Sequence, residues 1–212
     1  MQCIKDTIKN INIVIGCSIG CSYCYARMNN NRFHTIDDFN KPVFFENKLK
    51  MLDNKRHTAY LLTGQSDLSG WNEEWKDKVF SKMKENENTQ YIFLTKRPEN
   101  IKLKETPDNG WFSVTVTSSK EKTRIDYLRN NIKAKHYHIT FEPMFDDVGK
   151  LDLSNISWIV IGTETGNRKG KISSKREWVF NIYNQAKEKN IPVFMKEDEF
   201  VQEFPKEFGG IE

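Results

Sequence analysis

The chain has 212 residues, of which 37% are hydrophobic, 12% aromatic and 29% charged. Disordered chains are poor in aromatic residues, so this composition excludes a disordered protein, and the length fits one domain. The sequence contains no apolar run near the roughly 20 residues that cross a bilayer. Residues 1–10 also lack the apolar stretch of a secretory signal. We therefore expect a cytoplasmic protein without membrane contact.

The net charge of +4 is unevenly distributed along the chain. Residues 196–212 contain two lysines against six acidic residues, which leaves a net charge of +8 on the rest. A basic body is compatible with an anionic substrate or with nucleic acid. The acidic end suggests a division into a main domain, residues 1–198, and a short acidic C-terminal tail, residues 199–212.

Short runs rich in β-branched and aromatic residues alternate with amphipathic patterns. The runs predict strands over 11–16, 59–64, 91–95, 111–117, 136–141, 157–162 and 191–195. The patterns predict helices over 72–85 and 174–189, and a shorter helix around Ile125 and Leu128. This alternation is typical of a parallel α/β sheet covered by helices, either an open doubly wound sheet or a barrel. A full barrel takes ~250 residues, so a partial barrel of six or seven units is favoured over a complete one.

The most informative motif follows the first predicted strand. Cys17, Cys21 and Cys24 have the spacing C-x3-C-x2-C, with an aromatic residue before the third cysteine. In a reducing compartment, clustered cysteines are more often metal ligands than disulfides. Iron–sulfur clusters usually take four cysteines, so three would leave one iron of a [4Fe–4S] cluster open to a small molecule. Two alternatives remain: a zinc site completed by Cys3 or His34, and cysteines without metal.

Several further segments carry a resemblance to a known family, and together they span residues 13–198. They are GCSIGCSYCYAR, RFHTIDDF, LLTGQSDLSGW, FLTKRP, WFSVTVT, AKHYHITFEPMFDD, WIVIGTETG and IPVFMKED. The cysteine motif resembles the signature of radical S-adenosylmethionine (SAM) enzymes. The chain closely resembles the radical SAM mobile pair protein A group, and it is distantly similar to the phage Gp37/Gp68-like radical SAM proteins. The resemblance implies a partial (β/α)6-type barrel of parallel strands, to which this chain would add one strand.

The resemblance also implies the chemistry. In the superfamily, SAM binds the open iron of a [4Fe–4S] cluster, and its reductive cleavage yields a 5′-deoxyadenosyl radical that abstracts hydrogen from a substrate. The implied partners are an unidentified substrate, an electron donor of the flavodoxin or ferredoxin type, and a companion radical SAM protein. Two other functions stay open: an iron–sulfur or zinc-binding regulatory module without turnover, and a radical enzyme that modifies nucleic acid.

The resemblance assigns contacts with SAM to residues at the strand ends. The family's second-strand segment usually carries a carboxylate for the SAM ammonium, which is missing from the segment that begins at Thr63. Binding of the ammonium would then fall to backbone carbonyls or to Gln65, Ser66 or Asp67. The other implied contacts are Gly64 at the same segment, Tyr23 and Thr163 near the adenine, Thr115 and Thr117 at the ribose, and Arg124 at the SAM carboxylate.

Strand alternation over residues 136–141 gives one more inference. It places His138 on the face of Glu142, together with His136 and Thr140, and it turns the apolar residues of the strand toward the helices. Glu142, His138 and Lys96 are therefore candidates for managing protons or electrons at the substrate. The alternative for Glu142 is a structural ion pair with a lysine or arginine.

Residues 166–176, GNRKGKISSKR, form a strongly basic segment after the sixth predicted strand. The two glycines stand too close together for a phosphate-binding loop. One interpretation is a mobile basic lid for a phosphorylated or polymeric substrate, and the other is a solvated loop. We expect neutralisation of Lys169, Lys171 and Lys175 to weaken the binding of an anionic substrate.

Overall fold

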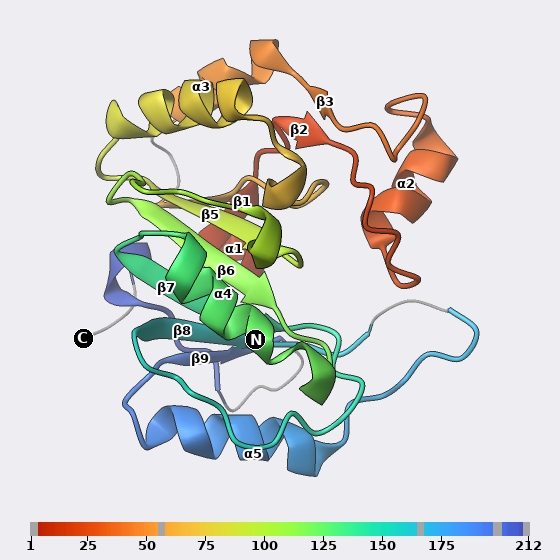
Figure 1. Ribbon diagram of the computed structural model, residues 1–212, viewed down its shortest axis with the longest axis vertical. Helices are drawn as coiled ribbons and strands as arrows, with labels where there is room; N and C mark the ends of the chain where they lie inside the picture. Colours follow the sequence, from red (N-terminus) through yellow and green to blue (C-terminus); the bar gives the residue numbers. More distant parts are fainter. Residues whose placement is uncertain (1–3, 55–57, 165–167, 197–200, 210–212) are drawn as a thin grey trace.

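A computed structural model describes residues 4–54, 58–164, 168–196 and 201–209. Its main sheet curls into a half-barrel of seven parallel strands (Figure 1). In spatial order these are β1 (Ile8–Asn10), β4 (Ala59–Leu61), β5 (Gln90–Thr95), β6 (Gly110–Thr115), β7 (His136–Phe141), β8 (Ile156–Ile161) and β9 (Val193–Met195). The order follows the chain without reversal, whereas a doubly wound sheet reverses at a switch point. The structure therefore agrees with the predicted partial barrel and excludes the doubly wound alternative.

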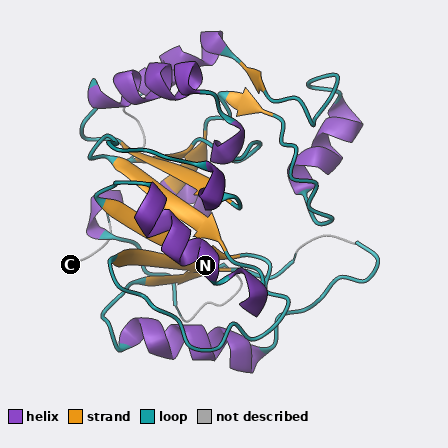
Figure 2. Ribbon diagram, in the orientation of Figure 1, coloured by secondary structure: helices purple, strands orange, loops and turns teal. Residues whose placement is uncertain are grey.

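Three helices cover the convex face of this sheet (Figure 2). They are α3 (Glu73–Lys84), α4 (Thr123–Asn131) and α5 (Arg176–Lys187), and they match the helices predicted from the sequence. The side chain of Asn72 caps α3 by accepting a hydrogen bond from the backbone N–H of Trp75, which satisfies a free donor of the first turn. Val79, Phe80 and Met83 then recur at helical spacing and are buried against the sheet.

The other helices of the fold are α-helices and 3-10 helices outside this layer. They are α1 (Ile4–Thr7), α2 (Tyr25–Phe33), η1 (Glu46–Asp53), η2 (Leu68–Gly70), η3 (Pro98–Asn100), η4 (Ser119–Glu121) and η5 (Lys206–Phe208). A second, two-stranded antiparallel sheet consists of β2 (Val14–Ile15) and β3 (Val43–Phe44). Across the described ranges, no helix has the length and apolar character needed to span a membrane.

The predicted first strand, 11–16, is confirmed only in part, because its residues Val14–Ile15 form β2, which pairs with β3 and not with the main sheet. The sheet begins earlier, at β1, and the chain then turns, because the backbone N–H of Ile13 bonds to the carbonyl of Ile11 at 3.2 Å instead of to a neighbouring strand. Both isoleucines are buried, so the turn between them leaves no trace in the apolar pattern of the sequence. The chain returns to the edge of the main sheet at Gly16, which forms a parallel bridge with Ser66.

The two faces of β7 behave as the alternation predicts. Tyr137, Ile139 and Phe141 belong to the main core beneath the helices. On the concave face, His138 pairs in register with Trp158, and Thr140 lies one layer nearer the carboxyl end of the strands. The concave face is therefore layered, with large aromatic side chains below and small polar ones above.

Residues assigned from the sequence to an acidic tail take part in the lower layer. Phe208 of η5 is 2% exposed, and its ring lies 4.7 Å from that of Trp111 and 5.3 Å from that of Trp158. The indole nitrogen of Trp158 also donates a 3.0 Å hydrogen bond to the carbonyl of Glu203. We call Trp111, Trp158, Phe194 and Phe208 the aromatic floor. The described part of the tail, residues 201–209, thus closes the floor of the half-barrel.

Candidate functional site

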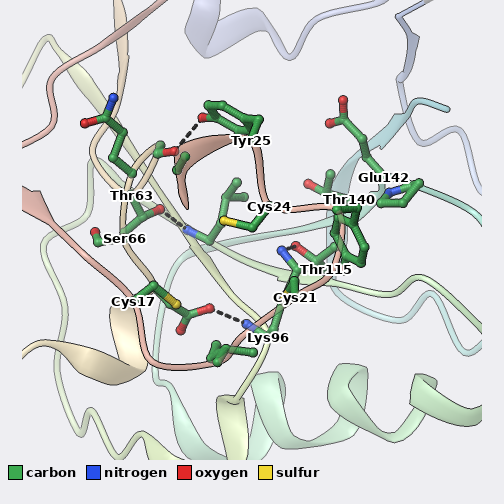
Figure 3. Close-up of a pocket in the computed structure, with 18 of the residues that line it drawn as sticks. Cys17, Cys21, Cys24, Tyr25, Thr63, Ser66, Lys96, Thr115, Thr140 and Glu142 are labelled. Carbon is green, nitrogen blue, oxygen red and sulfur yellow. Dashed lines mark hydrogen bonds between the residues drawn. The ribbon is translucent and has the colours of Figure 1, made fainter. Parts of the chain in front are cut away.

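A pocket lies above the aromatic floor, at the carboxyl ends of the strands, where α/β barrels place their sites. The cavity has a volume of about 240 Å³ and opens to solvent. Figure 3 shows residues that line it. The residues expected from the sequence that line it are Cys17, Cys21, Tyr23, Cys24, Gly64, Gln65, Ser66, Asp67, Lys96, Thr115, Glu142 and Thr163. Three others that the sequence assigned to the site, Thr117, Arg124 and His138, are not among the lining residues.

The three cysteines stand on the loop between β2 and α2. The loop enters through Gly16, whose φ of 115° disfavours other residues, and a Cβ there would approach Pro42 Cα to 2.9 Å. It ends at Cys24, which caps α2 by accepting a 3.4 Å hydrogen bond at Sγ from the backbone N–H of Arg27. All three thiols are free and partly exposed, and they face the same pocket.

The surroundings of Cys17 favour its protonated form. Burial, together with the negative charge of Asp67, raises the pKa of the Cys17 thiol to about 11. A thiolate at this position would therefore need a nearby cation, which a bound metal supplies. The donor set of three thiols on one short loop fits iron, which forms its protein-bound sulfur clusters through cysteine.

A single zinc ion is the alternative to a cluster that the sequence leaves open. Among the residues that the structure describes, no three His, Cys, Asp or Glu side chains are placed to hold one ion. A [4Fe–4S] cluster does not need such convergence, because each cysteine binds a different iron. Of the two fourth ligands considered for zinc, His34 is exposed at the C-terminal cap of α2, and Cys3 lies outside the described residues.

Arg27, for which no role was predicted, contacts the cysteine loop and the segment before β3. Its guanidinium donates to the carbonyl oxygen of Cys17 at 2.8 Å and to Oδ1 of Asn40 at 3.0 Å. It also lies 5.0 Å from the ring of Phe39, whose carbonyl accepts a 2.6 Å hydrogen bond from the N–H of Cys17. Helix α2 and the loop before β3 are thereby tied to the first cysteine.

Polar groups after β4 form the opposite wall of the pocket, and most are already hydrogen-bonded. The hydroxyl of Tyr25 donates to the carbonyl of Gly64, and Gly16 N–H donates to the carbonyl of Gln65 at 2.9 Å. The hydroxyl oxygen of Ser66 accepts a 3.0 Å bond from the indole of Trp71. Tyr25 therefore bridges the cysteine loop and β4 across the pocket (Figure 3).

Asp67 has a structural role in this wall. Its carboxylate accepts hydrogen bonds from the hydroxyl of Thr95 at 2.7 Å and from the N–H of Lys96 at 2.8 Å. It also caps η2 by accepting from the N–H and the hydroxyl of Ser69. With four donors already bound, this carboxylate fixes the backbone that presents Lys96 to the pocket.

Lys96 and Arg124 occupy different surroundings. The ammonium of Lys96 lies 3.5 Å from the hydroxyl of Thr115 and 5.8 Å from the ring of Tyr23, and it forms no ion pair within the described part of the chain. Arg124 instead donates to the carbonyl of Thr115 and pairs with Glu121, each at 2.8 Å.

Thr117 hydrogen-bonds to Glu121, the residue that also pairs with Arg124. Its hydroxyl and its backbone N–H both donate to Glu121, each at 2.7 Å. The contacts of Thr117 and Arg124 with SAM stay a prediction, although neither residue lines the pocket. Both side chains bind Glu121, Thr117 through a hydrogen bond and Arg124 through an ion pair.

Two ion pairs border the far side of the pocket. Glu142, after β7, pairs with Lys196, after β9, so the alternative of an ion-paired glutamate applies while its carboxylate still lines the pocket. Gly162 lies under it, because a Cβ there would come within 3.1 Å of the Glu142 carboxyl. Glu164 also lines the pocket, and its hydrogen bonds with Arg168 lower the pKa of its carboxyl.

The placement of His138 corrects the sequence-based expectation. The side chain shares the face of Glu142 but is 1% exposed, with its ring 5.4 Å from that of Trp158 and 6.4 Å from that of Trp111. Burial lowers the pKa of His138 to about 3, and its Nδ1 has no hydrogen-bond partner among the described residues. It belongs to the layer of the aromatic floor and does not reach the pocket.

Comparison with known proteins gives one match. No curated protein and no solved structure matches the chain. A family model with the description "Protein of unknown function (DUF5131)" matches residues 2–207. Because this match covers nearly the whole sequence, the chain belongs to the DUF5131 family of proteins of unknown function.

Proposed function

We propose that this protein is a radical SAM enzyme. The observation that carries the proposal is the set of three free, partly exposed cysteines that line one pocket at the carboxyl ends of a parallel half-barrel. Three protein thiolates leave one iron of a [4Fe–4S] cluster without a protein ligand, which suits a cluster that binds a small molecule. Polar residues that line the pocket, among them Ser66, Lys96 and Thr115, would orient such a molecule.

The chain's own residues would hold the two cofactors. Bound here, a [4Fe–4S] cluster and SAM supply reductive cleavage of the SAM sulfonium and a 5′-deoxyadenosyl radical that abstracts hydrogen from the substrate. Cys17, Cys21 and Cys24 would ligate the cluster. Lys96, whose ammonium lacks an acidic partner among the described residues, would bind the SAM carboxylate through a charge-assisted hydrogen bond. This assignment replaces Arg124, whose charge Glu121 already balances.

The remaining polar groups of the pocket would orient the ligands. Thr115 and Thr140 pair in register on neighbouring strands, and both line the pocket where a ribose would need hydroxyl partners. The carbonyl of Gly64 would become available to the SAM ammonium once the Tyr25 hydroxyl moves away. The Glu142–Lys196 pair, on the side away from β4, would contact the substrate and hold a proton at the Glu142 carboxylate.

The test is an anaerobic assay of the reconstituted protein. After reduction with dithionite and addition of SAM, we expect 5′-deoxyadenosine from the wild type and none from Cys24→Ala. The matched control is Cys3→Ala, which removes the cysteine outside the motif and should leave both the cluster and the product intact. Zinc without iron after reconstitution, or equal product from Cys24→Ala, would overturn the proposal.

One observation favours a second function, a cluster-binding module that does not turn over. The carbonyls of Gly64 and Gln65 are both occupied by donors from the protein, and the carboxylate usual in the resembled family is missing from this segment. A protein of this kind would hold iron and sulfide without yielding 5′-deoxyadenosine. Tyr25→Phe separates the two functions, because freeing the Gly64 carbonyl should raise SAM affinity in an enzyme and change nothing in a module that does not bind SAM.

A further inference from the structure

The basic segment between β8 and α5 follows the carboxyl end of a strand, the end of the sheet at which the pocket lies. Its described residues form a long loop in Figure 1. At its start, the guanidinium of Arg168 binds Glu164, a pocket-lining residue, with one N–O distance of 2.8 Å. Near its end, the hydroxyl of Ser174 donates a 3.3 Å hydrogen bond to the carbonyl of Met144, next to the pocket-lining Pro143. The described part of the segment, residues 168–176, is therefore anchored to the pocket at both ends.

Most of its positive charge is not neutralised. Glu164 balances Arg168, but Lys169, Lys171, Lys175 and Arg176 form no ion pair with any residue that the structure describes. All four are exposed, and no acidic residue interrupts residues 168–176. We call these four residues the basic rim. Four unbalanced charges this close together attract an anionic ligand, and the attraction is lost as salt rises.

Aromatic rings stand beside the charges. The ammonium of Lys175 lies 5.3 Å from the ring of Trp178, and the guanidinium of Arg176 lies 5.2 Å from the ring of Phe180. Across the pocket, α2 exposes Tyr25, which lines the pocket, and Phe33, which is 64% exposed. Surfaces that bind single-stranded nucleic acid combine these two features, since cations contact phosphates and rings stack on bases.

We infer that the basic rim is a docking surface for single-stranded nucleic acid, and that the substrate of this pocket is a nucleotide within such a strand. The assignment of a nucleotide as substrate rests on the proposed function, whereas the binding of the strand to the basic rim does not. Phosphates would contact the lysines, and the strand would pass over the pocket toward α2. An acidic peptide would meet the same charges without using the rings, so the test includes that outcome.

The experiment measures the binding of a labelled single-stranded RNA of about 20 nucleotides by fluorescence anisotropy over a series of salt concentrations. The variant Lys169→Gln/Lys171→Gln/Lys175→Gln removes three phosphate contacts. Each contact contributes about 0.7 to the slope of log affinity against log salt, so the slope should fall by about 2 and the affinity by about 100-fold near 0.1 M salt.

The control variant also loses three positive charges, but at the opposite end of the sheet. Lys84, Lys104 and Lys133 are exposed and precede β5, β6 and β7, and their replacement by glutamine should leave binding unchanged. An equal loss in both variants, or no loss in the first, would overturn the inference. Tighter binding of a poly-glutamate peptide than of RNA would also overturn it. Yield of 5′-deoxyadenosine from the rim variant without substrate reports on the proposed function separately, and it should equal that of the wild type.

Discussion

The guanidinium of Arg27, in the first turn of α2, donates a 2.8 Å hydrogen bond to the carbonyl oxygen of Cys17. Cys24 caps the same helix by accepting a hydrogen bond from the backbone N–H of Arg27, so one arginine links the first and the last cysteine of the motif. The bond is made within the protein and does not depend on a cofactor. We conclude that the positions of Cys17 and Cys24 relative to each other are fixed by the fold, before a cluster binds.

Replacing Arg27 should therefore loosen the cysteine loop. We expect Arg27→Gln to lower the affinity for iron and sulfide by about 10- to 100-fold, the usual effect of losing a residue that orients metal ligands. Lysine at this position should restore only part of the affinity. One nitrogen of Arg27 donates to both the Cys17 and the Asn40 oxygens, but an ammonium lacks the planar guanidinium that lies over the ring of Phe39. Iron and sulfide content after reconstitution at limiting iron measures the effect. Arg32→Gln, on the same helix, is the control, and equal loss from it would contradict the role of Arg27.

Lys96 and Arg124 give a paired prediction. If Lys96 binds the SAM carboxylate, Lys96→Met should weaken SAM binding by about 10- to 100-fold, since a hydrogen bond to a charged group is worth about 1.5–3 kcal/mol. Arg124→Met should leave SAM binding unchanged and lower stability instead, because Arg124 binds Glu121 and the Thr115 carbonyl. Equilibrium binding of SAM to the reconstituted protein measures both. A larger loss in Arg124→Met would restore the assignment made from the sequence.

The strand ends could be predicted from the sequence because parallel α/β sheets bring them together whatever the details of packing. The cysteine loop, Lys96 and Glu142 all follow strands, and all line the pocket. Depth along a strand could not be predicted in the same way. Alternation gives the face of His138 and Glu142 correctly, but at about 3.3 Å per residue the histidine lies about 13 Å below the glutamate. Thr140, two residues after His138 on the same face, already lines the pocket, so one layer of side chains separates the floor from the pocket.

The contacts of individual side chains were also difficult to predict from the sequence. Arg124 lies three residues after Glu121, a spacing at which opposite charges pair on a helix, so this pair carried a signal in the sequence. The contact between Arg27 and Cys17 carried none, because it depends on how α2 folds back over the loop. The break after β1 was equally hidden, since buried isoleucines continue through the turn at Ile11 and Ile13.

His138 should make the protein less stable in acid. Its folded pKa lies near 3, below the ordinary value, so as the pH falls below about 6.5 the unfolded chain gains a proton that the folded chain does not. The free energy of unfolding should then decrease by about 2 kcal/mol from this residue between about pH 7.5 and pH 5. In His138→Leu this contribution disappears. Lowering the pH from about 7.5 to 5 should therefore reduce the free energy of unfolding of the variant by about 2 kcal/mol less than that of the wild type. Urea denaturation at the two pH values measures it, and parallel pH profiles would contradict it.

The aromatic floor depends on the end of the chain. Phe208 is 2% exposed and contacts the rings of Trp111 and Trp158, so Phe208→Ala leaves a cavity that nearby backbone cannot fill. We expect a loss of about 3–5 kcal/mol in the free energy of unfolding, the usual cost of removing a buried phenylalanine ring. Tyr127→Ala, which removes an exposed ring from α4, is the control and should cost far less. Since the floor lies beneath the pocket and the cysteine loop above it, iron loading of the folded Phe208→Ala protein should stay at the wild-type level. A loss of stability no greater than that of the control would mean that residues 201–209 do not support the half-barrel.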